Sequence, residues 1–193
     1  MIENLPMPAS IRERLMSVVS GRHYLIATDG SCIRNPGRGG WSYVKQLKEG
    51  DKLLRQGVNA RQSSERVTTN IKMEMTAALK AVKGIAETET PVIIVSDNLM
   101  LCKGMTEWLP GWKAKGWRRT TGALENSGLW KSLDAACEGK NVHWVWVKGH
   151  AGYQLNEMAD TLARNAAEGK YPNGPDSVKA MYPHWFEDQT GVL

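Results

Sequence analysis

The chain has 193 residues, of which 41% are hydrophobic and 23% charged, and its formal net charge is +5. These values are typical of one globular domain with additional tail sequence, and no apolar run approaches the roughly 20 residues of a membrane helix. The start lacks the basic and apolar stretches of a secretory signal, and three scattered cysteines form no disulfide framework or metal-ligand spacing. We therefore expect a cytoplasmic protein with no membrane contact, and the basic charge favours an anionic partner such as nucleic acid.

The first half of the chain predicts a helix, three strands and a second helix. Apolar residues at helical spacing predict a short amphipathic helix within residues 1–20. A buried strand over 24–28 runs into Asp29. Two more strands, joined by a turn at 49–51, complete a meander, and a polar loop over 61–70 leads to an amphipathic helix. These last segments are expected at 41–48, 53–60 and 72–86.

The second half predicts a buried strand at 92–95, ending in Ser96-Asp97, and later a strand at 141–147. Helices are expected at 98–103, 105–112, 128–137 and 155–167. The sequence from Gly169 is rich in Pro and Gly and shows no period. This order predicts an α/β fold with a mixed sheet and helices on its faces. The strand at 92–95 should lie parallel to the strand at 24–28, in the middle of the sheet.

Two apolar strands are each followed by an aspartate, Asp29 and Asp97. If the strands are parallel neighbours, both carboxylates emerge at the same edge of the sheet, where α/β proteins gather their ligands. Each aspartate alone is also ordinary turn chemistry. The matching positions favour a shared site.

Glu74 shares a helix face with the apolar residues Ala78, Ala81 and Ile85, so the helix should point it inward. A buried carboxylate requires a cation, although a first-turn glutamate could instead interact with the helix dipole. Clustered carboxylates repel one another unless a metal binds them. Mg²⁺ prefers such oxygen ligands, and two ions suit hydrolysis of a phosphodiester.

Four motifs in order resemble type 1 ribonucleases H. They are Thr28-Asp29-Gly30-Ser31-Cys32 with Asn35-Pro36-Gly37, then Thr68-Thr69-Asn70 with Met73-Glu74, then Ser96-Asp97, and finally Trp144 to Gly152 with Asn156-Glu157 and Ala159-Asp160. The resemblance runs from about Tyr24 to Ala167. It implies a ribonuclease H-like fold with a five-stranded mixed sheet flanked by helices.

The resemblance also implies an endonuclease that hydrolyses the RNA strand of an RNA–DNA hybrid and leaves 3′-hydroxyl and 5′-phosphate ends. Asp29, Glu74, Asp97 and Asp160 would be catalytic ligands of two Mg²⁺ ions, for which Mn²⁺ could substitute. His150 would be a fifth catalytic residue, assisting proton transfer or product release, with a pKa near neutrality as that role requires. A monomer is expected.

Recognition of RNA depends on contacts to the 2′-hydroxyl. The family pattern suggests Cys32, Arg34, Asn35 and Asn70, besides Glu74, for these contacts. It suggests Asn35, Thr69 and Lys72 for a phosphate of the DNA strand. Asn35 and Asn70 could equally be residues that only form turns.

Residues 108–130 resemble the family's basic protrusion. The segment 112–131 carries five basic residues and one acidic residue, a net charge of +4. We expect the tryptophans to form mainly a small core, with some stacking surface, and the cations to contact phosphates. The substrate contacts predicted here are Trp112, Lys113, Lys115, Trp117, Arg118 and Arg119.

Three residues depart from the family pattern. Ile71 and Leu99 stand where relatives often carry asparagine and glutamine, and Lys72 replaces a usual arginine and so lacks the bidentate fork. These departures affect predicted substrate contacts and leave the carboxylates intact.

The expected organisation is an extension over residues 1–20, a catalytic domain over 21–168 with a basic protrusion at about 105–131, and a tail over 169–193. Two other functions remain open. One is a non-catalytic module that binds a hybrid or duplex, and the other is a nuclease acting on DNA, such as a transposase or integrase core.

Overall fold

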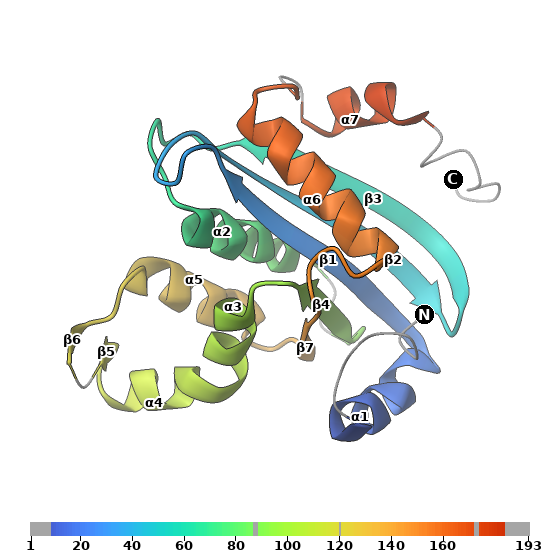
Figure 1. Ribbon diagram of the computed structural model, residues 1–193. Helices are drawn as coiled ribbons and strands as arrows, with labels where there is room; N and C mark the ends of the chain where they lie inside the picture. The colour runs from blue at the N-terminus through green and yellow to red at the C-terminus, as the bar shows by residue number, and fades with distance from the viewer. Residues whose placement is uncertain (1–8, 87–88, 120, 172–173, 184–193) are drawn as a thin grey trace.

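A five-stranded mixed sheet forms the centre of the molecule, with strand order β3-β2-β1-β4-β7. The computed structural model describes residues 9–183 except 87–88, 120 and 172–173. Helix α6 crosses one face of the sheet and α2 lies on the other face (Figure 1). The predicted five-stranded mixed sheet is thereby confirmed. The strands are β1 (Arg22–Cys32), β2 (Gly39–Glu49), β3 (Lys52–Gln62), β4 (Val92–Ser96) and β7 (Val142–Trp146).

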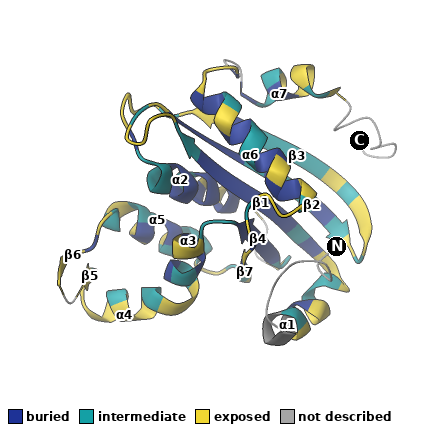
Figure 2. Ribbon diagram, in the orientation of Figure 1, coloured by how far each residue is buried: buried dark blue, intermediate teal, exposed yellow. Residues whose placement is uncertain are grey.

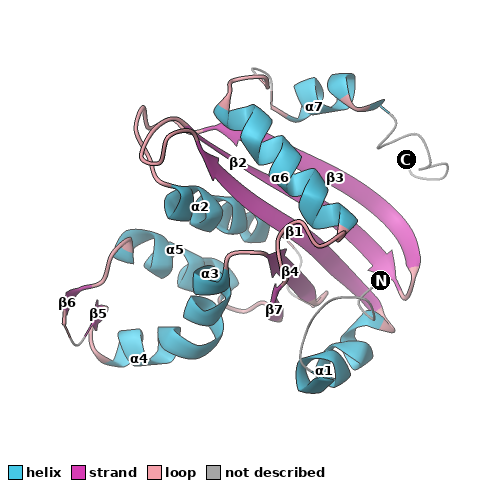
Figure 3. Cartoon of the chain, viewed as in Figure 1, coloured by secondary structure: helices cyan, strands magenta, loops and turns pink. Residues whose placement is uncertain are grey.

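The predicted helices are present in the predicted order, with differences in their bounds (Figure 3). Helix α2 ends at Lys83, three residues earlier than predicted, and the segment from Gly169, for which we predicted no period, contains helix α7. A small hairpin, β5 (Arg118–Arg119) and β6 (Gly122–Ala123), was also not predicted. The helical segments are α1 (Ala9–Val19), α2 (Asn70–Lys83), α3 (Leu99–Lys103), the π-helical turn η2 (Gly104–Trp108), α4 (Leu109–Ala114), α5 (Ser127–Cys137), α6 (Gln154–Ala167) and α7 (Pro175–Met181).

Strand β1 is the middle strand, antiparallel to β2 and parallel to β4, as predicted. Successive side chains of a strand point to opposite faces of the sheet. Leu25 and Ala27 accordingly pack in the apolar cluster that contains α6, whereas Ile26 packs in the cluster that contains α2. The alternation along β1 therefore decides which helix each residue meets.

The segments flanking the predicted catalytic domain also contribute to the core. Leu15 of α1 and Val178 of α7 are fully buried and belong to the cluster on the α6 face (Figure 2). The amphipathic helix predicted within residues 1–20 is thereby confirmed. No helix among the described residues is long and apolar enough to cross a membrane.

His23, buried near the start of β1, should make stability depend on pH. Burial lowers its pKa, and the charge of Lys48 acts in the same direction, while the ring contacts the Gly21 carbonyl at 3.0 Å from Nδ1. The unfolded chain, with a pKa near 6.5, then binds the proton more readily than the folded one. The stabilising contribution is therefore present above pH 6.5 and is lost as the pH falls through the lower folded pKa.

Urea unfolding at pH 7.5 and pH 5.5 measures this effect. We expect the wild type to lose more stability between the two values than His23→Gln does. Equal losses in the two proteins would contradict the assignment to His23.

Candidate active site

Three carboxylates from three different elements meet at one point. Asp29 of β1, Glu74 of α2 and Asp97, directly after β4, each place one oxygen so that the three oxygens lie within 4.8 Å of one another. Asp29 and Glu74 are buried and Asp97 is half-buried. The structure thus brings together three of the four carboxylates predicted as metal ligands.

Asp29 lies inside β1, not at the end of a strand as predicted. The strand continues to Cys32 because it still pairs with β2, where Asp29 lies opposite Ser42. Its parallel pairing with β4 nevertheless stops at Ala27 opposite Val95. Asp29 and Asp97 each follow two residues later, so the prediction that they neighbour each other at one edge is confirmed.

Glu74 reaches this edge because α2 lies very close to β1. A Cβ added to Gly30 would overlap the backbone of Met73 and Glu74, so only glycine permits this approach. Thr69 caps the helix by accepting a hydrogen bond from the Lys72 nitrogen at 3.4 Å. Since α2 begins at Asn70, Glu74 lies beyond the first turn, and the alternative explanation through the helix dipole is wrong.

The surroundings of Asp29 and Glu74 oppose ionisation of these two buried acids. Burial raises the pKa of Asp29 well above its usual value, and the neighbouring charges of Asp97 and Asp160 add to this rise. Burial likewise raises the pKa of Glu74, with further contributions from Asp29 and Asp97. The buried Glu74 Oε2 has no hydrogen-bond partner in the described part of the chain. A cation is the missing partner that would satisfy this oxygen and offset the repulsion.

Asp97 is positioned by β7, the turn that follows it and α6. The buried Asn156 donates to its carboxylate at 3.4 Å, and the Trp146 indole donates to its backbone carbonyl at 2.9 Å. A Cβ on Gly149 would come within 2.6 Å of its Oδ2 atom. These three residues were not predicted to act on Asp97, because nothing in their local sequence indicates that they face a residue about fifty positions away.

Asp160 is not a member of the three-carboxylate cluster and pairs with Arg164 on α6. It occupies the middle of the helix. It still acts on the site, because its charge raises the pKa of Asp29 and that of Arg164 lowers it. Asp29 points to the same face of β1 as Ala27, and Ala27 packs on the side of the sheet covered by α6. This is the helix that carries Asp160. The Arg164 partner was missed, although its i,i+4 spacing from Asp160 was a readable signal.

His150 lies in the turn between β7 and α6. The residue is exposed and its φ is +52°, in the left-handed region. It directly follows Gly149, where an added Cβ would come within 2.6 Å of Asp97 Oδ2. The predicted histidine is therefore accessible to solvent at the edge of the site.

The residues predicted to contact the substrate backbone surround the start of α2. The side chain of Asn35 accepts a hydrogen bond from the Asn70 nitrogen at 3.1 Å, and Cys32 donates to the Thr68 carbonyl at 3.3 Å. Lys72 pairs with Glu65 at 3.3 Å. Arg34 is exposed with a φ of +55°. Turn formation by Asn35 thus fixes the position of the helix start and leaves this surface accessible.

The predicted protrusion consists of η2, α4 and the β5–β6 hairpin, next to α5 (Figure 1). Trp112 contacts Trp108 and Trp130 at ring-centroid distances of 5.7 and 5.0 Å, so these rings form a small core. Lys131 lies 5.8 Å from the Trp117 ring centroid. The predicted role of tryptophans as packing residues agrees with these contacts.

The cations of the protrusion lie on its surface. Lys113 pairs with Asp134 at 2.8 Å and Arg119 with Glu125 at 3.2 Å, while Lys115 and Arg118 are exposed. A hollow of about 430 Å³ includes Lys115, Arg118 and Arg119 in its lining. The two ion pairs are partly exposed to solvent and leave the surface basic.

The family model of RNase H matches residues 21–168. Ribonuclease H of Aliivibrio salmonicida strain LFI1238 is 44% identical over 144 residues, which cover 74% of this chain and 87% of that protein. Ribonuclease HI of Vibrio cholerae serotype O1, strain El Tor Inaba N16961, is 42% identical with the same coverage. The chain therefore belongs to the RNase H family. Within it, the chain is an endoribonuclease of the ribonuclease HI type.

Solved structures agree with this assignment. The chain resembles LC9-RNase H1, described as a type 1 RNase H with the type 2 active-site motif, with a TM-score of 0.67 and 32% identity over 77% of this chain and 74% of that one. The foamy viral protease-reverse transcriptase in complex with RNA/DNA hybrid has a TM-score of 0.65 and 22% identity, over 78% of this chain and 21% of that one. The latter comparison shows the fold alone.

Proposed function

We propose that this enzyme cuts the RNA strand of RNA–DNA hybrids by a two-metal-ion mechanism, leaving 3′-hydroxyl and 5′-phosphate ends. The observation that carries the proposal is the cluster of Asp29, Glu74 and Asp97, whose oxygens lie within 4.8 Å of one another. Such a cluster fits a divalent cation because all its donors are hard oxygens and Glu74 Oε2 has no other partner. We propose Mg²⁺, with Mn²⁺ as a substitute.

Different residues of the protein would have different roles in this reaction. Asp29, Glu74 and Asp97 would hold the ions, with Asp160 as a fourth ligand once it leaves Arg164. Bound divalent ions supply activation of the attacking water and stabilisation of the leaving oxygen. His150, exposed on its turn, would carry a proton or help the product leave.

We further propose that the surface around Asn35, Asn70 and Thr69 contacts the hybrid's two strands next to the cluster. Cys32, Arg34 and Lys72 would add contacts there. The protrusion would bind phosphates through Lys113, Lys115, Arg118 and Arg119, with Trp112 and Trp117 supporting them. The chain would act as a cytoplasmic monomer, with residues 21–168 as the catalytic domain between two extensions.

Cleavage of labelled duplexes tests the function. The protein is incubated with an RNA–DNA hybrid, double-stranded RNA and double-stranded DNA, each with Mg²⁺ or with EDTA. We expect Mg²⁺-dependent cutting of the hybrid's RNA strand alone. Binding without cutting would instead support the non-catalytic module, and cutting of DNA would support the transposase-like alternative.

The two apolar departures from the family pattern should weaken the hybrid contact. Leu99 is 45% exposed beside Asp97, and Ile71 is half-buried in the first turn of α2. Ile71→Asn with Leu99→Gln would restore groups able to form hydrogen bonds, each contributing about 0.5–1.5 kcal/mol. We therefore expect the hybrid Kd to fall by roughly 5-fold or more. An unchanged Kd, measured by fluorescence anisotropy in an inactive background, would contradict this prediction.

A further inference from the structure

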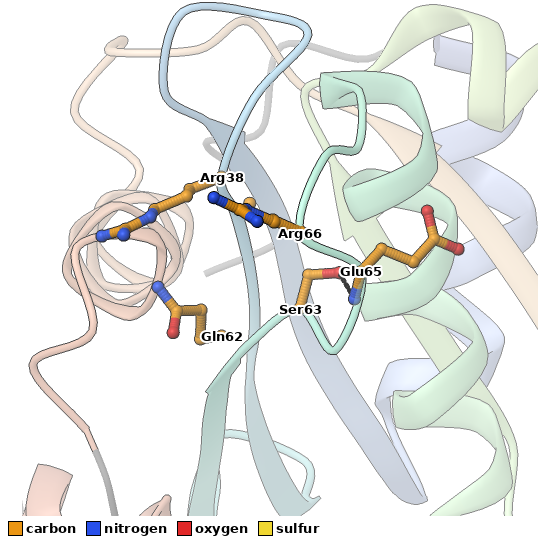
Figure 4. A pocket seen from close by; sticks show the side chains of 6 residues that line it. Arg38, Gln62, Ser63, Glu65 and Arg66 are labelled. Carbon is orange, nitrogen blue, oxygen red and sulfur yellow. Dashed lines mark hydrogen bonds between the residues drawn. The ribbon is translucent and has the colours of Figure 1, made fainter.

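A hollow lined by two arginines lies between the β1–β2 turn and the β3–α2 loop. Its volume is about 250 Å³, and Figure 4 shows the side chains that line it. It contains none of the cluster carboxylates and none of the residues predicted to contact substrate. The lining consists of Arg38, Gly39, Gln62, Ser63, Glu65 and Arg66.

Neither guanidinium group in this hollow has a counter-ion among the residues that the structure describes. Arg38 and Arg66 are exposed, and neither is a member of the ion pairs formed among the described residues. Glu65 is the one carboxylate in the lining, and it pairs with Lys72 at 3.3 Å. In Figure 4 its carboxylate points toward α2, away from the two arginines. The hollow therefore presents uncompensated positive charge.

The remaining lining groups are held by the backbone. Ser63 donates its backbone N–H to the Gly39 carbonyl at 2.8 Å, and its hydroxyl accepts from the Glu65 nitrogen at 3.1 Å. The Gln62 amide donates to the Ala167 carbonyl at 3.0 Å. The two loops that carry the arginines are thus tied to the sheet and to α6.

The hollow adjoins the surface that we propose for the DNA strand. Gly37 and Thr68 exchange two backbone hydrogen bonds, of 3.0 and 2.8 Å, which join the two loops. Arg38 directly follows Gly37, and Arg66 precedes Thr68 by two residues. Asn35 and Thr69 lie on the other side of the same bridge. A nucleic-acid strand carries a phosphate every ~3.4 Å along the duplex axis, so a strand held at Asn35 and Thr69 brings further phosphates past this bridge.

We propose that Arg38 and Arg66 form a second backbone-phosphate site, which binds a phosphodiester of the same strand next to the contact at Asn35 and Thr69. The inference rests on the proposed function, because it requires that the chain binds a hybrid. A planar guanidinium matches the oxygens of a phosphate through paired hydrogen bonds, and two of them clamp it from two loops. The site fixes the strand and increases affinity without touching the reacting atoms.

The salt dependence of binding tests this site. Asp29→Asn serves as the inactive background, and the Kd for a labelled hybrid is measured between 50 and 200 mM salt. Each phosphate contact contributes about 0.9 to the slope of log K against log salt. We expect Arg38→Gln with Arg66→Gln to reduce the slope by about 1 and to weaken binding roughly 5- to 10-fold at 0.1 M salt.

A matched pair of arginines controls for the loss of net charge. Arg22 begins β1 and Arg55 lies in β3, and both are exposed. Arg22→Gln with Arg55→Gln removes the same two charges and should leave the slope unchanged. Arg38→Lys with Arg66→Lys should retain the salt slope, because both positive charges are kept. It should weaken the affinity for the hybrid, because lysine lacks the paired hydrogen bonds of a guanidinium. Melting temperatures confirm that all variants are folded.

The second phosphate site would be overturned if the slope of log K against log salt were the same for the Arg38/Arg66 glutamine variant as for the Arg22/Arg55 glutamine variant. A second result would also overturn it. Inorganic phosphate would stabilise the wild type but not the glutamine variant, while the salt slope of hybrid binding would be the same for both. The two arginines would then bind free phosphate and not a phosphate of the strand. Failure of the proposed function is distinct, since the wild type would then not cut the RNA strand of the hybrid in Mg²⁺, whatever the salt slope of binding.

Discussion

Asp29→Asn should lower hybrid cleavage in Mg²⁺ by at least about 10³-fold, equal to about 4 kcal/mol of activation free energy, while leaving the protein folded. The carboxylate is 5% exposed and shares its site with Glu74 and Asp97. An amide has nearly the same shape but provides no negative charge, so it weakens metal binding without changing the packing. Initial rates on a labelled hybrid, together with circular dichroism, measure the two effects separately.

The same substitution should stabilise the metal-free protein. The folded pKa of Asp29 is raised by burial and by its acidic neighbours, so the unfolded chain loses its proton at lower pH than the folded one. Folding stability is then greatest below the unfolded pKa and falls as the pH rises through the folded pKa. In EDTA at pH 8 we expect Asp29→Asn to gain about 1–3 kcal/mol, or roughly 2–10 °C in Tm.

Asp51→Asn is the control for both measurements, because Asp51 is exposed in the β2–β3 turn. It should change neither cleavage nor stability appreciably. Retention of cleavage by Asp29→Asn would refute the metal assignment. A lower melting temperature in EDTA would show that Asp29 has a stabilising partner other than a metal.

Gly30→Ala should cost about 3 kcal/mol of stability or more and should also impair cleavage by molecules that remain folded. The added methyl would overlap the backbone of Met73 and Glu74, and a backbone cannot rotate away as a flexible side chain can. Helix α2 must therefore move from β1 and carry Glu74 away from Asp29. Urea unfolding measures the stability, and cleavage assays well below the Tm measure the activity.

Gly57→Ala supplies the matched control within the same sheet. Gly57 lies in β3, and a Cβ there meets nothing within 4 Å. Alanine is preferred over glycine in a strand by roughly 0.5–1 kcal/mol, so this variant should be as stable as the wild type or slightly more stable. If Gly30→Ala behaved like Gly57→Ala, the close approach of α2 to β1 would not be what positions Glu74.

Much of the sheet and three of its site residues could be predicted because their signals are local. The apolar runs that end near Asp29 and Asp97 predicted two buried parallel strands, and the helical period predicted the inward direction of Glu74. These patterns depend only on the geometry of a strand or helix. Asp160 carried no such signal, and its place in the prediction came from the family resemblance alone.

The features that were missed depend on tertiary contacts. Asn156 reads as an ordinary polar helix residue, and its partner Asp97 is 59 residues away. Helix α7 has seven residues, too few to be stable alone, and it forms where Val178 packs into the core. Strand β1 exceeds its apolar run because β2 continues to pair with it as far as Cys32.

The position of α7 beside β3 has a consequence for how the sheet meets other proteins (Figure 1). An outer strand offers unpaired backbone groups on which another chain can add a strand and aggregate. Here β7, the outer strand on one side, has only five residues, and β3 on the other side carries Lys52 and Arg55 and has an irregular register at Leu47–Lys48 of its partner. Val178 of α7 packs in the same cluster as Val58 of β3. Helix α7 thus packs against an edge strand of the sheet, and we expect it to help limit the addition of another chain there.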